Sequence, residues 1–111
     1  MRRPDDQLTQ FRKGAIELAI LALLRAEELD AGDILARLAQ RPGLDAPAGT
    51  VYPLLARLGK AGLVSTTWRE SPAGPPRTYY RLTTTGHDQL DDLTRAWRTL
   101  ATSLSTLLEE R

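Results

Sequence analysis

The residues from Gly49 to Val64 combine small, hydroxyl-bearing and basic side chains in a way that suits contact with DNA. Read as a helix, the segment places its larger apolar residues on one stripe, namely Val51, Leu54, Leu55 and Leu58. The other side carries small residues and the candidate DNA contacts Thr50, Tyr52, Arg57 and Lys60. Such a helix suits a DNA major groove. The alternative is a helix that packs by its leucines and leaves a solvated outer face.

The sequence offers few residues for a metal site, a disulfide or a catalytic site. The chain has no cysteine and one histidine, His87, so no disulfide or thiolate metal site is predicted, and no metal or cofactor is expected. We interpret His87 as a surface residue. No pair of carboxylates is set apart from the surface charge, so an enzyme is the least supported class of protein.

The length of 111 residues fits one domain whose modest core would gain from oligomerisation. Up to Leu82 there are 12 basic against 9 acidic residues, whereas Thr83 to Arg111 hold 3 against 5. The basic excess therefore coincides with the candidate DNA-binding part. The most apolar run, Ala15 to Leu24, is shorter than the ~20 residues that span a bilayer. We expect a soluble, cytoplasmic protein with no membrane partner.

Two runs of β-branched and aromatic residues, Leu63 to Trp68 and Thr78 to Leu82, predict a β-hairpin. The stretch between them, Ser71 to Arg77, is interpreted as turn-forming throughout. Arg69 and Arg77 are expected to reach DNA phosphates or a minor groove from the ends of this hairpin. The alternative is a hairpin that only covers the core, with its aromatic residues as packing groups.

Three more helices are predicted around these segments. Phe11 to Ala26 is apolar nearly all round, which indicates burial against its own domain and against a partner subunit. A short helix follows, with Asp30 as its N-cap. Thr83 is expected to cap a last helix that runs from about Thr84 to Glu109. The leucines of that helix and Trp97 recur every third or fourth residue, which is typical of a coiled-coil seam.

This seam predicts a twofold homodimer. The expected interface residues are Leu18, Leu21, Leu90, Leu93, Trp97, Leu100 and Leu104. Two recognition helices on one side of the dimer would read half-sites of a palindromic operator about 34 Å apart. Arg2 and Arg3 belong either to a frayed terminus or to a basic arm that touches the DNA backbone.

The run Gly-Thr-Val-Tyr-Pro-Leu-Leu-x-Arg-Leu-x-Lys-x-Gly-Leu-Val at 49–64 closely resembles the third helix of the PadR family of bacterial transcriptional regulators. The resemblance continues through Trp68, Gly74 to Thr83, Gly86 and Trp97 and covers most of the chain. It implies a fold that is mainly α with a small β-hairpin. Residues 1–82 would form a winged helix-turn-helix DNA-binding domain and residues 83–111 a long C-terminal dimerisation helix. It also implies a dimeric repressor of transcription that binds double-stranded DNA.

The sequence departs from the family pattern at three places. The family usually has His-Gly-Tyr where this chain has Asp30-Ala31-Gly32, so no role can be transferred to the missing tyrosine ring. It usually has Ser-Pro where this chain has Pro47-Ala48, so the third helix lacks its ordinary side-chain cap. Ala56 stands where many relatives carry a basic residue, which predicts lower DNA affinity or more dependence on the wing.

The resemblance also implies a ligand site. Some family members bind flat aromatic molecules near the dimer interface, next to a tryptophan of the last helix. The matching pocket here would be lined by Leu93, Ala96, Trp97 and Leu100, and a small aromatic effector there would weaken operator binding. The alternative is that Trp97 is only a hydrophobic anchor of the dimer. For the whole chain, the rival function is a winged-helix module that binds a protein.

Overall fold

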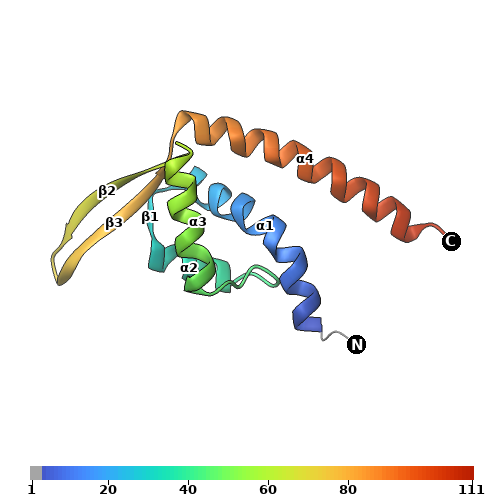
Figure 1. Ribbon diagram of the computed structural model, residues 1–111, viewed down its shortest axis with the longest axis horizontal. Coiled ribbons are helices and arrows are strands. Elements are labelled where there is room, and N and C mark those ends of the chain that lie inside the picture. Colours follow the sequence, from blue (N-terminus) through green and yellow to red (C-terminus); the bar gives the residue numbers. More distant parts are fainter. Residues whose placement is uncertain (1–3) are drawn as a thin grey trace.

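The computed structural model describes the backbone of residues 4–111 and the side chains from Ala15 onward. The elements follow one another as α1 (Pro4–Ala26), β1 (Leu29–Asp30), α2 (Ala31–Ala39), α3 (Ala48–Lys60), β2 (Val64–Ser71), β3 (Gly74–Leu82) and α4 (Thr84–Glu109). The proposed basic arm of Arg2 and Arg3 lies outside the described residues. Figure 1 shows α1, α2 and α3 packed together, with the β2–β3 hairpin and α4 extending from this body in different directions.

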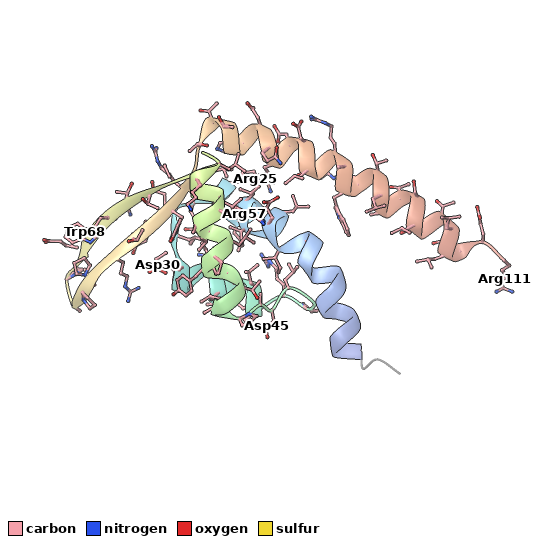
Figure 2. The ribbon with its side chains drawn as sticks, in the orientation of Figure 1. Arg25, Asp30, Asp45, Arg57, Trp68 and Arg111 are labelled. Atoms are coloured by element: carbon pink, nitrogen blue, oxygen red, sulfur yellow. The ribbon has the colours of Figure 1, made fainter. Side chains whose placement is uncertain are left out.

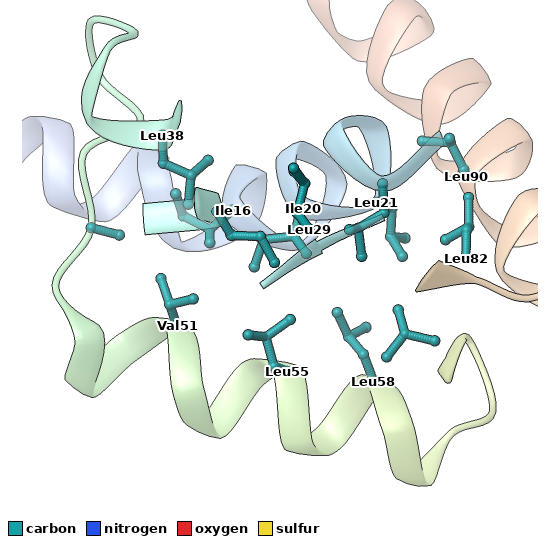
Figure 3. Close-up of a cluster of buried hydrophobic side chains, with 14 residues drawn as sticks. Ile16, Ile20, Leu21, Leu29, Leu38, Val51, Leu55, Leu58, Leu82 and Leu90 are labelled. Carbon is teal, nitrogen blue, oxygen red and sulfur yellow. The ribbon is translucent and has the colours of Figure 1, made fainter. Parts of the chain in front are cut away.

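The core lies between the inner stripe of α3 and the helix α1. Val51, Leu55 and Leu58 of α3 are at most 1% exposed, and Figure 3 shows them facing the apolar residues of α1 and β1. The core residues Ile16, Ile20, Leu21, Leu24, Leu29, Ile34, Leu38, Ala46, Val51, Leu55, Leu58, Val64, Leu82 and Leu90 form one cluster. The leucine stripe predicted for the third helix is thus its buried face.

The ends of α2 and α3 follow from local hydrogen bonds. Asp30 caps α2, as predicted, because its Oδ1 accepts the amide of Asp33 at 2.8 Å. The N-cap of α3 is Pro47, which makes no side-chain cap; its carbonyl accepts from the amides of Thr50 and Val51 instead. Just past the end of α3, Gly62 has a φ of +76°, a left-handed conformation that glycine adopts without strain.

The sheet has three antiparallel strands in the order β1-β3-β2. The predicted hairpin is confirmed, but its strands are longer than the sequence indicated. Ser71 pairs with Gly74, so the turn is only Pro72 and Ala73, and the interpretation of Ser71 to Arg77 as turn throughout is wrong. Two features let Pro75 and Pro76 fit in β3. The β1 side is open there, since β1 pairs only at Leu29–Tyr80 and Asp30–Tyr79, and the register with β2 is irregular between Arg69–Arg77 and Ser71–Gly74. The strand β1 itself was not predicted.

The helix α4 begins on the body and then leaves it. Thr83 caps it, as predicted, by accepting the amide of Gly86 at 2.9 Å, while the Thr83 hydroxyl donates to the carbonyls of Gly62 and Leu63. A Cβ on Gly86 would lie 2.0 Å from the carbonyl oxygen of Leu63, so this close approach requires glycine. Beyond the first turns α4 extends alone, and the molecule measures 58 × 33 × 21 Å (Figure 1).

Candidate DNA-binding surface and adjoining hollow

The outward side of α3 is small, exposed and carries one lysine. Gly49, Pro53, Ala56 and Lys60 are all exposed and succeed one another at intervals of three or four residues, which puts them on one strip opposite the buried stripe. A Cβ built on Gly49 meets nothing within 4 Å. Among the described residues, Lys60 takes part in none of the ion pairs. This strip can approach a DNA groove closely and offers a single charge to phosphate.

Arg57 and Thr50 lie at one edge of that strip, on the side of α1. The Arg57 side chain is 69% exposed, yet its Nη2 donates to Oε1 of Glu17 on α1 at 3.4 Å. Arg57 is on the predicted DNA-facing side, but its partner could not be predicted, because Glu17 is 40 positions away along the chain.

Tyr52 lies at the opposite edge of the strip, toward the wing. It is 50% exposed and borders an open cleft of about 490 Å³ between α2, α3 and β3. The cleft is lined by Asp30, Ala31, Gly32, Asp33, Tyr52, Arg77, Thr78 and Tyr80. A predicted recognition-helix residue and a predicted wing residue, Tyr52 and Arg77, therefore meet across one cleft.

The wing residues Arg69 and Arg77 are both paired with carboxylates at the β1 edge. Arg77 Nη1 donates to Oδ2 of Asp30 at 3.0 Å, and Arg69 Nη2 donates to Oε2 of Glu28. The Arg69 guanidinium also lies 4.7 Å from the centre of the Tyr79 ring. Neither carboxylate was predicted as a partner of the wing. Of the wing aromatics, Tyr79 and Tyr80 are half-buried, while Trp68 is 62% exposed and projects from the hairpin (Figure 2).

Asp30 is the buried charge of this region, with a residue exposure of 6%. The backbone amide of Asp33 is the main influence that lowers the pKa of the Asp30 carboxyl, and Arg77 lowers it further, against the opposing effect of burial. The carboxylate is therefore kept ionised, and it joins the start of α2 to the wing.

A second hollow lies between α1 and α4. It holds about 190 Å³ and is lined by Glu17, Leu18, Leu93, Ala96, Trp97 and Leu100. All four residues proposed for the effector pocket line it, together with Leu18 from the proposed dimer interface. Glu17, whose carboxylate also pairs with Arg57 of α3, lines the hollow as well and was not predicted there.

The proposed dimer residues fall into two groups. Leu21 and Leu90 are 0% and 1% exposed, because both side chains are buried in the core of their own subunit. The prediction that these two residues form the dimer interface is therefore corrected. Leu18 and Leu93 are half-buried. Trp97, Leu100 and Leu104 are about half exposed, at 51%, 54% and 48%, and form an apolar strip on α4 that continues to Leu107 at 61%.

The side chains described in residues 15–111 can be compared with the needs of a metal site, and the helices with those of a membrane span. No group of three histidine, cysteine, aspartate or glutamate side chains there could hold a metal ion. His87 is exposed near the start of α4. None of the helices, over their described residues, is long and apolar enough to cross a membrane.

Residues 20–92 match the PadR-like family of transcriptional regulators. This segment holds α2, α3, both wing strands and the start of α4, which are the elements that build the surface described above. The chain belongs to the PadR-like family. A comparison with curated proteins found no match.

Solved structures of PadR-like proteins share both the fold and much of the sequence. A PadR-like transcription factor from Bacteroides fragilis is 40% identical, with a TM-score of 0.74 over 89% of this chain and 95% of its own. A PadR family regulator from Eggerthella lenta is 30% identical, with a TM-score of 0.85 over 96% and 93%. A PadR-like regulator from Bacillus cereus is 31% identical, with a TM-score of 0.84 over 92% and 99%.

The expected fold is therefore confirmed as the PadR winged helix with a long C-terminal helix. PadR-like membership makes the chain a DNA-binding regulator of transcription and not an enzyme.

Proposed function

We propose that this PadR-like chain is a homodimeric, cytoplasmic repressor that binds a palindromic operator and releases it when a small aromatic molecule binds. The observation that carries the DNA-binding part is the outer strip of α3, whose residues are exposed and mostly small and which is flanked by Tyr52 and the wing. The small residues of the strip allow close approach to the edges of the DNA bases, and Lys60 and Thr50 supply contacts to the DNA backbone.

The homodimer is argued from the apolar strip of α4. Trp97, Leu100, Leu104 and Leu107 are each about half exposed or more, on a helix that extends beyond the body of its own subunit. A second copy presents the same strip, so two α4 helices can cover each other as an isologous pair. In this arrangement residues 1–82 read DNA and residues 83–111 join the subunits.

The effector is argued from the hollow beside Trp97. Its volume of about 190 Å³ suits a compact ring system, and its lining is apolar apart from Glu17. A ligand there would lie where α4 leaves α1, so it could favour one angle between these helices and thus one spacing of the two DNA-reading heads. Release of the operator requires that the ligand bind the low-affinity arrangement more tightly than the operator-bound one.

The function can be tested by fluorescence anisotropy with labelled DNA from immediately upstream of the protein's own gene. The expected result is saturable binding that exceeds binding to scrambled DNA and weakens steeply with salt. Lys60→Ala should reduce the slope of log affinity against log salt by about one per subunit. Arg95→Ala is the matched control, because Arg95 is an exposed basic residue of α4 whose partner is Asp92 of the same helix.

The rival function, a winged-helix module that binds a protein, makes the opposite prediction. It requires no preference for any DNA over scrambled DNA and no effect of Lys60→Ala on what little binding remains. Fragments of genomic DNA captured by the purified protein distinguish this case from an operator that lies elsewhere.

A further inference from the structure

Two arginines of the wing stand directly opposite each other in the sheet, since Arg69 of β2 is in register with Arg77 of β3. Two like charges at such a position repel and destabilise the strand pair unless each has a counter-ion. Each has one here: Glu28 accepts from Arg69 and Asp30 accepts from Arg77. Glu28 and Asp30 lie two residues apart at β1, so one short segment of the body holds both strands of the wing.

These two ion pairs act where backbone pairing to the body has ended. β1 pairs with β3 only at Tyr79 and Tyr80, and the hairpin beyond that point projects away from the helices (Figure 1). Arg77 lies two residues further out than Tyr79, and Arg69 lies opposite it. Asp30, only 6% exposed, is itself fixed as the N-cap of α2. The anchor of the outer wing is therefore a rigid part of the helix-turn-helix.

From these contacts we propose that Glu28 and Asp30 clamp the wing at a set angle to the recognition helix. Arg69 and Arg77 are then positioning residues, which affect DNA binding through the direction of the wing and not through direct phosphate contact. An arginine that turned away from its carboxylate toward a phosphate would leave that carboxylate unpaired, and for Arg77 this would leave Asp30 charged in a buried position. This inference rests on the DNA-binding function proposed above.

The geometry of the wing can be measured without DNA. The chain has no cysteine, so spin labels can be placed at Ala73→Cys in the wing turn and Asp45→Cys in the loop before α3. Pulsed electron paramagnetic resonance should give a narrow distance distribution in this background. Asp30→Asn is the informative variant, because asparagine caps a helix as well as aspartate does but carries no charge. The clamp predicts a clearly broader distribution in Asp30→Asn and in Arg77→Ala; unchanged distributions in both would overturn it.

The affinity for the operator provides the second test. The clamp predicts that Asp30→Asn and Arg77→Ala each weaken specific binding by about five- to tenfold with little change in the salt slope, and that the double variant is no worse than either single one. Direct phosphate contact by Arg77 predicts a salt slope lower by about one in Arg77→Ala and unchanged or tighter binding in Asp30→Asn. That second pattern would overturn the proposal. If the wild-type chain bound no specific DNA, the proposed function would fail, and the distance measurement would still decide the clamp.

Discussion

At the scale of single residues, Asp30 has the most demanding position in the chain. It is almost fully buried, ionised, bonded to the Asp33 amide and paired with Arg77. The backbone hydrogen bond and the arginine together outweigh burial, so its pKa in the folded protein lies below the ordinary value of 3.8. A group with a depressed folded pKa stabilises the fold above its unfolded pKa and stops doing so as pH falls through the folded value.

The free energy of unfolding should therefore depend on pH through the ionisation of Asp30. We expect the difference in unfolding free energy between wild type and Asp30→Asn to be constant above about pH 5 and to shrink as the pH falls below about 4. Urea unfolding followed by circular dichroism between pH 3 and 7 measures it. A difference that persisted unchanged to pH 3 would show that Asp30 contributes through its shape and cap alone.

Gly86 lies where the start of α4 packs so closely against Leu63 that there is no room for a side chain. Gly86→Ala would push a methyl group into the Leu63 carbonyl and the Leu82 side chain, at 2.0 and 2.8 Å. We expect a loss of roughly 1–3 kcal/mol or more, as for an overpacked core. The matched control is Gly59→Ala, another helical glycine, where a Cβ meets nothing within 4 Å. That change should be neutral or stabilise α3 by about 0.5–1 kcal/mol. Equal melting temperatures for the two variants would contradict the packing argument.

How far single residues could be predicted depends on how local their partners are. Asp30 and Thr83 as caps were predictable, because a cap bonds to an amide three residues away. The partners of Arg57, Arg69 and Arg77 were not, since each ion pair joins positions 40 to 47 residues apart. All three arginines were predicted as DNA contacts from their type, and only the fold reveals carboxylates beside them.

At the scale of elements, helices with a clear apolar stripe were predicted well and the wing less so. The last helix has the bounds that its cap and seam indicated. The prolines of the wing suggested a long turn, but strand β3 accommodates them because its β1 side needs no donor there and its pairing with β2 is irregular at the same place. The strand β1 has only two residues, too few for a pattern in the sequence, so it can be recognised only by its pairing with β3.

The strip on α4 gives the prediction at this scale. Leu104→Glu should shift the protein from dimer to monomer in analytical ultracentrifugation, with little change in the fold of the subunit, because Leu104 is 48% exposed in the single chain. Thr102→Glu is the control: it adds the same charge to the same turn, on the opposite side of α4. Dissociation by both variants, or by neither, would argue against pairing through the leucine strip.

At the scale of the whole molecule, Glu17 connects the two candidate binding surfaces. Its carboxylate lines the hollow beside Trp97 and accepts from Arg57 at the edge of the recognition helix. A positively charged ligand in the hollow would compete with Arg57 for this one carboxylate. Ligand binding in the hollow then alters the affinity for DNA, and DNA binding alters the affinity for the ligand by the same factor.

We therefore expect the hollow to favour a cationic planar ring over a neutral analogue of the same shape, by several-fold. Quenching of tryptophan fluorescence measures ligand affinity, with and without operator DNA. Glu17→Gln should remove the preference for charge and reduce the effect of ligand on DNA affinity, while Asp92→Asn, which removes an exposed carboxylate of α4, should change neither. An intact preference in Glu17→Gln would mean that Glu17 is not the counter-ion.

The prolines of the wing have a further consequence for the protein in concentrated solution. A hairpin that projects into solvent exposes strand edges, and such edges can recruit strands from other molecules and begin aggregation. Successive backbone nitrogens of a strand point to opposite edges, so one of Pro75 and Pro76 removes a donor from the open edge of β3. On the other side, the β2–β3 register shifts between Arg69 and Ser71, close to the tip. Near the tip, where the wing reaches furthest past the body, neighbouring molecules thus meet an interrupted edge on which a further strand is harder to add.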